Sequence, residues 1–217
     1  DGMYTAGVLD TFMDHKDVIK ELGAIRHLME RSSKFISISG LSGILIGIYA
    51  LIGAGLAFLK VYGFKSSLSY RDHYVNSPEV VLFLCLVALS VLTLSMATGL
   101  WMAKRKAQRL GQSVWNTTSR SLLFAMAVPL CTGGILSLLL ISKGMLGLIA
   151  STLLIFYGLS LSAGSIYTFK EVKWLGIFEI LLGLLALLLP GYGLFFWAMG
   201  FGILHIIYGF IVYKKYE

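Results

Sequence analysis

The sequence predicts an all-α, polytopic membrane protein in which an N-terminal amphipathic helix precedes six transmembrane helices arranged as three hairpins. Hydrophobic residues make up 57% of the chain and charged residues only 13%, whereas soluble domains carry about 25% charged residues. Six apolar runs follow residue 34, and a span needs about 20 such residues. Lys and Arg gather in alternate connections between these runs. Because helices satisfy their own backbone hydrogen bonds in lipid, these runs are expected to be helical.

Residues 1–34 are predicted to form a polar N-terminal segment that contains an amphipathic helix over 14–34. Val18, Leu22, Ile25 and Met29 recur at helical spacing and form one apolar stripe. Such a helix lies on the membrane surface or packs against a partner helix. The first apolar run begins only near Phe35, after this charged segment, so no cleavable signal peptide is expected.

Residues 35–217 are predicted to form the six-helix membrane domain. The six runs cover residues 35–59, 79–102, 121–141, 145–168, 174–189 and 194–213. The fifth run is short for a span, but Pro190 and Gly191 can continue it to the interface. Glycines spaced along these runs indicate faces where helices pack closely or where two chains form a dimer. The candidate packing residues are Gly43, Gly47, Gly176, Gly183, Gly202 and Gly209.

The distribution of cationic residues predicts that both termini are cytoplasmic. Fourteen of the 18 Lys and Arg fall on the side that holds the N-terminal segment, the 104–120 connection and Lys214, and cytoplasmic segments carry this excess. The same pattern explains the net charge of +7 without a nucleic-acid partner. The basic 104–120 loop is expected to contact anionic lipid headgroups of the bilayer.

One acidic residue and one histidine stand out in the last two runs. Glu179 lies in a G-x-x-E-x-x-x-G pattern with Gly176 and Gly183, and His205 lies in a G-x-x-H-x-x-x-G pattern. Their depths from the cytoplasmic ends differ by roughly 5 Å, so antiparallel helices can bring them together. Such a pair can relay a proton or bind a cation or polar solute. It can equally form a structural hydrogen bond between helices, or Glu179 can simply reach the cytoplasmic interface.

The sequence predicts no cofactor, no metal site and no catalytic residue. Cys85 and Cys131 lie in apolar runs without ligand spacing, and they are expected to be buried free thiols. Gly40-Leu41-Ser42-Gly43 matches G-x-S-G, and together with His205 this arrangement resembles the rhomboid proteases. In those enzymes the serine lies on the fourth helix, whereas Ser42 lies on the first. An intramembrane serine hydrolase is therefore the third-ranked function.

Two stretches resemble known groups of proteins. The glycine-rich last two runs, with Pro190 between them, resemble the small bacterial HdeD-type membrane proteins over about forty residues. The segment from Glu21 to Ala54 resembles uncharacterised six-helix bacterial membrane proteins. These resemblances imply a bacterial inner-membrane location and no activity. The sequence favours a non-enzymatic integral membrane protein that acts by helix packing, as a homodimer or with a membrane-protein partner; the alternative is a small-solute or proton-linked transporter that uses Glu179 and His205.

Overall fold

The computed structural model describes residues 39–63, 77–109, 111, 113–189 and 191–217. Within these ranges the structure is helical and contains no β-strand, which confirms the predicted all-α fold class. The expected amphipathic helix over 14–34 lies outside the described residues.

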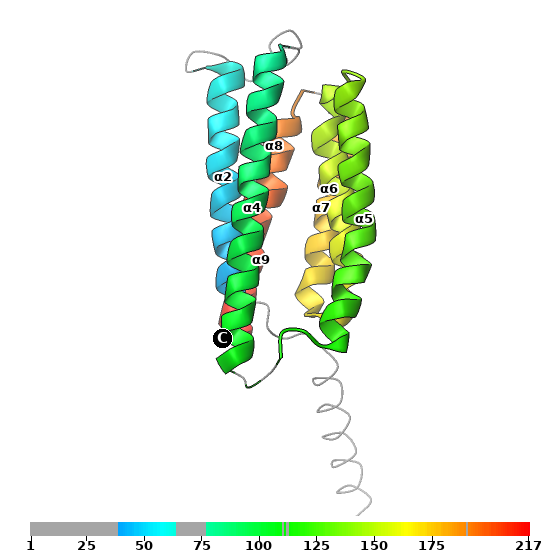
Figure 1. Cartoon of the computed structure of the whole chain (residues 1–217). Helices are drawn as coiled ribbons and strands as arrows, with labels where there is room; N and C mark the ends of the chain where they lie inside the picture. Colours follow the sequence, from blue (N-terminus) through cyan, green and yellow to red (C-terminus); the bar gives the residue numbers. More distant parts are fainter. Residues whose placement is uncertain (1–38, 64–76, 110, 112, 190) are drawn as a thin grey trace, which may run out of the picture. The chain divides into compact units, whose positions relative to one another are not determined.

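The described helices follow the six apolar runs (Figure 1). They are α2 (Gly40–Tyr62), α4 (Pro78–Arg109), α5 (Thr117–Ser142), α6 (Ile149–Gly164, flanked by short 3-10 turns η1 Leu146–Leu148 and η2 Ser165–Tyr167), α7 (Lys170–Leu188), and a last helix built from α8 (Gly193–Trp197), the π-helix η3 (Ala198–Leu204) and α9 (His205–Tyr216). Several helix bounds exceed the apolar runs, among them the end of α4 and the start of α7. Helix α4 continues through its basic residues to Arg109, and α7 begins at Lys170, because Lys, Arg and Glu favour helix as well as most apolar residues do.

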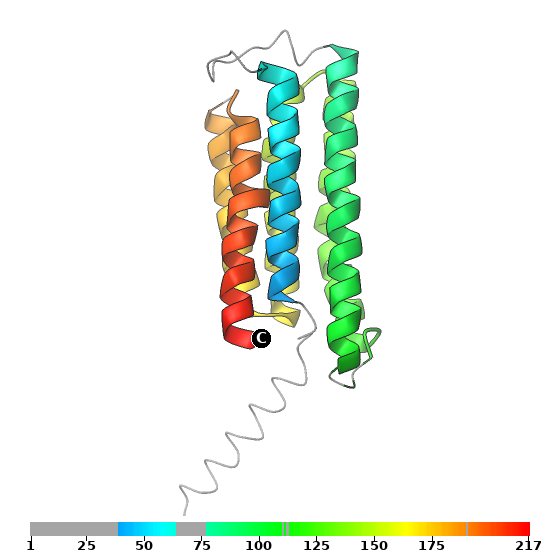
Figure 2. The ribbon, with the colours of Figure 1, turned by 90° about the vertical axis from the view of Figure 1, so that its left-hand side faces the viewer.

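Five of the described helices are long and apolar enough to cross a membrane. The sixth, α7, has 19 residues, a length of about 28 Å, but it also carries Lys170, Glu171, Lys173 and Glu179. It nevertheless runs alongside the other five helices (Figure 2). The protein is therefore a polytopic helical membrane protein by architecture.

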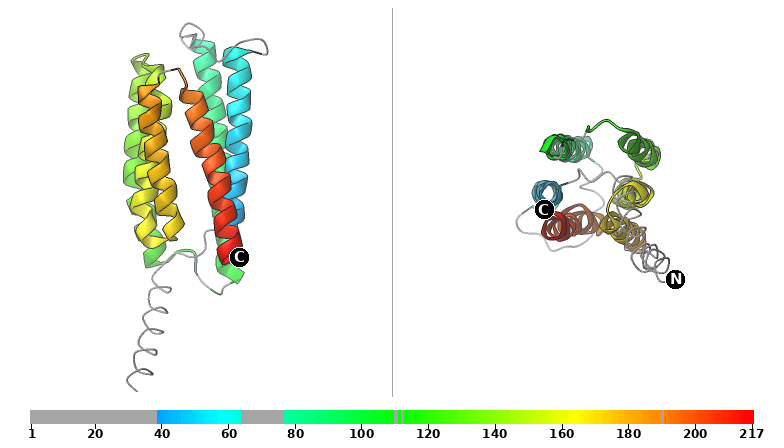
Figure 3. Two further views of the ribbon diagram at one scale, coloured as in Figure 1. Left: turned by 180° about the vertical axis from the view of Figure 1, so that it is seen from behind. Right: turned by 90° about the horizontal axis from the view of Figure 1, so that it is seen from below.

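The helices pack as two groups that meet along the last helix (Figure 3). Helix α2 packs against α4 and against α9, whereas α6 packs against both α5 and α7. The groups are joined where α6 and α7 contact α8 and η3. Consecutive helices run antiparallel, as the three-hairpin prediction requires, but α7 packs chiefly on α6 and the last helix chiefly on α2.

Within each group, one helix–helix interface brings backbones close together at glycines, and we call these two interfaces the glycine seams. In the first, an added Cβ at Gly47 would lie 2.6 Å from the Gly202 carbonyl oxygen, and one at Gly209 would lie 2.5 Å from the Ile44 amide nitrogen. In the second, between α6 and α7, a Cβ at Gly158 would lie 2.5 Å from the Gly176 carbonyl oxygen. Only glycine permits this backbone approach, which is how helices gain packing energy in lipid.

The remaining predicted packing residues lie in the same two seams. A Cβ at Gly43 would come within 3.0 Å of Gly209 Cα, one at Gly202 within 2.5 Å of Leu51 Cδ2, and one at Gly183 within 2.6 Å of Ile155 Cγ1. The spacing of small residues along the sequence therefore points to the observed helix–helix contacts within one chain.

Charged residues gather at one end of the bundle, which we call the basic end. Here α4 and α9 end, α5 and α7 begin, and the C-terminal residue lies (Figure 1). Of the eleven described Lys and Arg, nine lie at this end, and only Lys60 and Lys143 lie at the opposite end. The prediction that both cysteines are buried is wrong: Cys85 and Cys131 are exposed, because α4 and α5 turn most of their surface away from the protein.

Candidate functional site

The two ionisable residues of the last two apolar runs meet inside the bundle. Glu179 of α7 is 0% exposed and His205, the first residue of α9, is 3% exposed. The distance from His205 Nδ1 to Glu179 Oε1 is 3.4 Å. Because α7 begins at Lys170 rather than at Trp174, Glu179 lies nine residues from its helix end, and its depth matches that of His205 better than the apolar runs suggest.

His205 is held by one hydrogen bond within the last helix and one to α6. Its Nδ1 lies 3.0 Å from the carbonyl oxygen of Gly200, and its Nε2 lies 2.8 Å from the hydroxyl of Tyr157 on α6. A carbonyl oxygen can only accept, so Nδ1 carries the proton of the first bond. In the neutral ring Nε2 then accepts from the Tyr157 hydroxyl, and the imidazole orientation is fixed from both sides.

The turn before His205 makes room for the carboxyl group of Glu179. Residues Ala198–Leu204 form a π-helix, a widened turn that inserts an extra residue and often marks functional sites. A Cβ at Gly200 would overlap Glu179 Oε2 and would lie 2.5 Å from Leu154 Cδ2. Glycine at position 200 is therefore what allows the carboxyl group to lie against the last helix.

Neither carboxyl oxygen of Glu179 has a hydrogen-bond donor among the described residues. The Nδ1–H of His205 donates to the Gly200 carbonyl at 3.0 Å, and Nδ1 lies 3.4 Å from Glu179 Oε1. An ionised carboxylate in such a position costs several kcal/mol unless it is compensated. Glu179 and His205 are thus a close but incompletely bonded acid–imidazole pair.

Aromatic rings surround the imidazole. The ring centroids of Tyr157 and Phe201 are 5.0 Å apart, those of Tyr157 and His205 are 5.4 Å apart, and Phe201 stacks on His205 at 6.1 Å. Trp197 continues the cluster at 5.3 Å from Phe201. These rings pack around the pair, and neither Glu179 nor His205 lines the cavity beside Cys85 or the cavity beside Tyr192.

Ser42 does not join this pair in any described contact. Its hydroxyl donates to the carbonyl oxygen of Ser39 at 2.6 Å, whereas His205 is bonded to Gly200 and Tyr157. No group of three or more His, Cys, Asp or Glu among the described residues could hold a metal ion.

Sequence reasoning missed Tyr157, Gly200 and Phe201. Tyr157 could have been noticed as a hydroxyl at mid-span in an apolar run, where a polar side chain needs a partner. Gly200 carried no comparable signal, since its role depends on the π-helix and on the neighbouring helix.

A second polar cluster lies at the basic end, around Glu217. The carboxylate Oε1 of Glu217 accepts a hydrogen bond from the backbone N–H of Gly40 at 3.0 Å and one from Lys106 Nζ at 3.0 Å. Burial alone would raise the pKa of Glu217, but hydrogen bonds from Lys106, Ser39 and Gly40 lower it below its ordinary value of 4.5. This carboxylate therefore ties the starts and ends of three helices together.

No protein-family model, curated protein or solved structure matches this chain.

Proposed function

We propose that this chain is a non-enzymatic integral membrane protein that acts by assembling with a second copy or with another membrane protein. The observation that carries the proposal is a contrast in burial. Glu179 and His205 are sealed inside the chain, whereas in the apolar stretch of α4 only 6% of the residues are buried. A helix that covers so little of its surface within the chain leaves that surface for lipid or for a partner.

The hydrogen bond between Tyr157 and His205, beside Glu179, then stabilises the packing of the helices. Tyr157 from α6, Glu179 from α7 and His205 from the last helix meet at one point, where the two helix groups join. Interhelical polar contacts in membranes contribute about 0.6–2 kcal/mol each. Together with the glycine seams, they hold four helices as a fixed platform for α4 and α5.

A cysteine-crosslinking experiment tests the assembly. Leu86, Thr93 and Ala97 lie on one exposed face of α4, at i, i+7 and i+11. Single cysteines at these positions, in a chain with Cys85→Ser and Cys131→Ser, are expected to form interchain crosslinks in native membranes. Val91→Cys is the matched control, because Val91 packs against Gly53 of α2 and is expected to form none. Absence of any crosslink at all three exposed positions contradicts the proposal.

Transport is the second candidate, and the incompletely bonded carboxyl group of Glu179 favours it. A buried acid beside a histidine and a tyrosine can take up and release a proton when water reaches it. In reconstituted vesicles, Glu179→Gln would then abolish flux of a proton or small solute while the fold stays intact. If unmodified protein shows no flux in the same vesicles, this candidate fails.

We also propose that the basic end is cytoplasmic, in a bacterial inner membrane. The excess of described Lys and Arg at this end supports the orientation. Arg105 lies 5.5 Å from the Trp101 ring, and Trp115 is 66% exposed, so the 104–120 segment offers cations and an aromatic ring to anionic headgroups. Labelling of a single cysteine at Ser113 from outside intact cells would overturn this orientation.

A further inference from the structure

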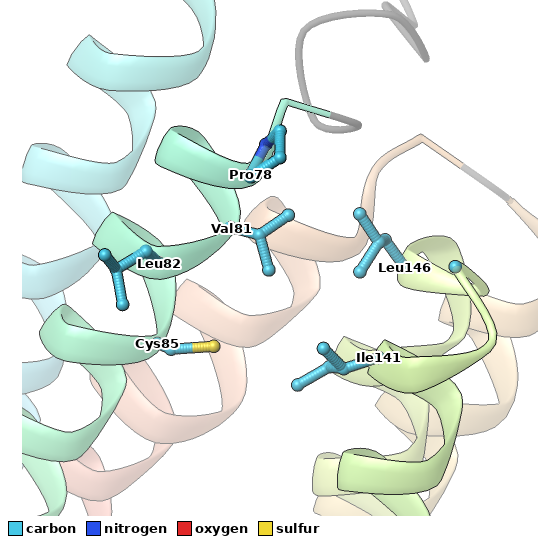
Figure 4. Close-up of a pocket in the computed structure, with 7 residues that line it drawn as sticks. Pro78, Val81, Leu82, Cys85, Ile141 and Leu146 are labelled. Atoms are coloured by element: carbon cyan, nitrogen blue, oxygen red, sulfur yellow. The ribbon is translucent and has the colours of Figure 1, made fainter.

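An apolar groove lies between α4 and the α5–α6 turn, at the end opposite the basic end (Figure 4). Its volume is 660 Å³, which is within the range of ligand pockets. Its walls come from the first turns of α4 and from the end of α5 and the start of η1. The lining side chains are Pro78, Val81, Leu82, Cys85, Ile141 and Leu146.

The groove exists because α4 and α5 are neighbours in sequence but not in packing. Helix α4 turns Val87 and Val91 toward Gly53 of α2 and makes no extensive contact with α5 among the described residues. An apolar groove that stays empty loses dispersion contacts along its walls. In a bilayer, the surrounding acyl chains are the material that can restore those contacts.

The volume favours a flexible chain over a helix as the occupant. A helix about 10 Å wide would fill 660 Å³ with only about one and a half turns. Such a short helix contact is a weak basis for seating a second copy, whereas a hydrocarbon chain can follow the groove along α4.

Two charged residues are direct neighbours, along the chain, of residues that line the groove. Glu79 follows Pro78 in the first turn of α4, and Lys143 precedes Gly144 at the end of α5; both are exposed. A cation and an anion at headgroup depth complement the phosphate and the ammonium group of a zwitterionic phospholipid. We propose that this groove binds one phospholipid, with an acyl chain between α4 and α5 and the headgroup near Lys143 and Glu79. This inference does not depend on the assembly role.

Lipid retention measures the proposed binding. Protein purified in mild detergent is expected to retain about one phospholipid per chain, quantified by mass spectrometry after extraction. Cys85→Trp fills the groove and is expected to reduce retention at least threefold. Leu86→Trp is the matched control, because Leu86 is 54% exposed and does not line the groove, and it is expected to retain lipid as the unmodified protein does.

Two further variants keep the test decisive. Ile141→Phe fills the groove from the other wall if Cys85→Trp fails to fold, and Lys143→Glu is expected to weaken retention by removing the phosphate partner. Equal lipid retention in the unmodified protein and both groove-filling variants overturns the proposal. An interchain Cys85–Cys85 disulfide in native membranes, formed with Cys131→Ser present, also overturns it, since the groove would then hold a second copy.

Discussion

Helices α2 and α4 are both long apolar spans, yet they are built for different neighbours. In α2 the small residues Gly40, Gly43, Gly47, Ala50 and Ala54 are all buried, and the last helix approaches its backbone directly. In α4 only Val80, Ala103 and Ala107 are buried, and large side chains such as Leu86, Met96 and Leu100 are more than half exposed. Two helices of similar hydropathy therefore differ in packing: α2 packs inside the protein, whereas α4 leaves most of its surface exposed.

The difference teaches that side-chain size, not hydrophobicity, selects the helices that pack inside this protein. Lipid tails are as apolar as leucine, so burying a leucine between helices gains little over leaving it in lipid. Removing side chains altogether lets backbones meet and adds dispersion contacts. The glycine-poor helix α4 consequently stays at the periphery.

The most direct test of this difference is to replace a hydrogen by a methyl group at one glycine in a seam and at one glycine outside it. Gly209→Ala places a Cβ 2.5 Å from the Ile44 amide nitrogen and is expected to destabilise the protein by about 1–3 kcal/mol or more. Gly99→Ala meets nothing within 4 Å and is expected to be neutral or stabilising by up to ~1 kcal/mol. Thermal unfolding in detergent measures both changes in stability. Equal stabilities of the two variants would contradict the close packing of the last helix against α2.

Removal of the imidazole should have an effect of comparable size. His205→Ala leaves the Tyr157 hydroxyl and the Gly200 carbonyl without their bonds and opens a cavity, so we expect a loss of about 2–4 kcal/mol. Tyr157→Phe removes one hydrogen bond and should cost about 1 kcal/mol. A His205→Ala variant as stable as the unmodified protein would show that the site holds nothing together.

The acid should behave differently from the imidazole. Glu179 has no donor among the described residues, so Glu179→Gln removes a buried ionisable group without breaking a described hydrogen bond. We expect its free energy of unfolding to stay within about 1 kcal/mol of the unmodified value, or to rise. A loss as large as that of His205→Ala would instead reveal a strong partner for the carboxylate.

The smallest expected effect concerns how α4 is held at the basic end. The lowered pKa of Glu217 means that its ionised form is favoured by folding. Its contribution is therefore present above pH 4.5 and is lost as the pH falls through the lower folded value. Because Glu217 and Lys106 keep 19% and 20% of their side-chain surface exposed, we expect less than about 1 kcal/mol.

A pH series of unfolding measurements tests this contribution. In Glu217→Gln the free energy of unfolding should fall less as the pH is lowered than it does in the unmodified protein. Glu79→Gln, at the opposite end, serves as the control variant. If Glu217→Gln loses as much stability at low pH as the unmodified protein does, the described contacts of Glu217 do not stabilise the folded chain.

The positions of the helices followed closely from the apolar runs, because each run must bury its backbone polar groups in helical hydrogen bonds. The bounds differed mainly where charged residues extended α4 and α7, since hydropathy does not register a helix that continues into water. The burial of the cysteines was mispredicted for a related reason: an apolar run does not reveal which of its faces contacts protein and which contacts lipid.

The candidate site was accessible to sequence reasoning only in part. The glycine frames around Glu179 and His205 mark both as lying on close-packed faces, and the structure places the two side chains 3.4 Å apart. The part played by Tyr157 depends on α6 packing against α7, and no spacing in the sequence relates position 157 to position 205.

The sequence by itself determined that the chain is a helical membrane protein, where each helix lies and which faces are free of large side chains, because these follow from local hydropathy and side-chain size. Only the tertiary structure decided that α2 pairs with the last helix, that a π-helix at 198–204 opens space for a carboxyl group, and that α4 stands apart from α5. These features depend on how distant backbones fit against each other, and that fit is a property of the packed bundle rather than of any one run.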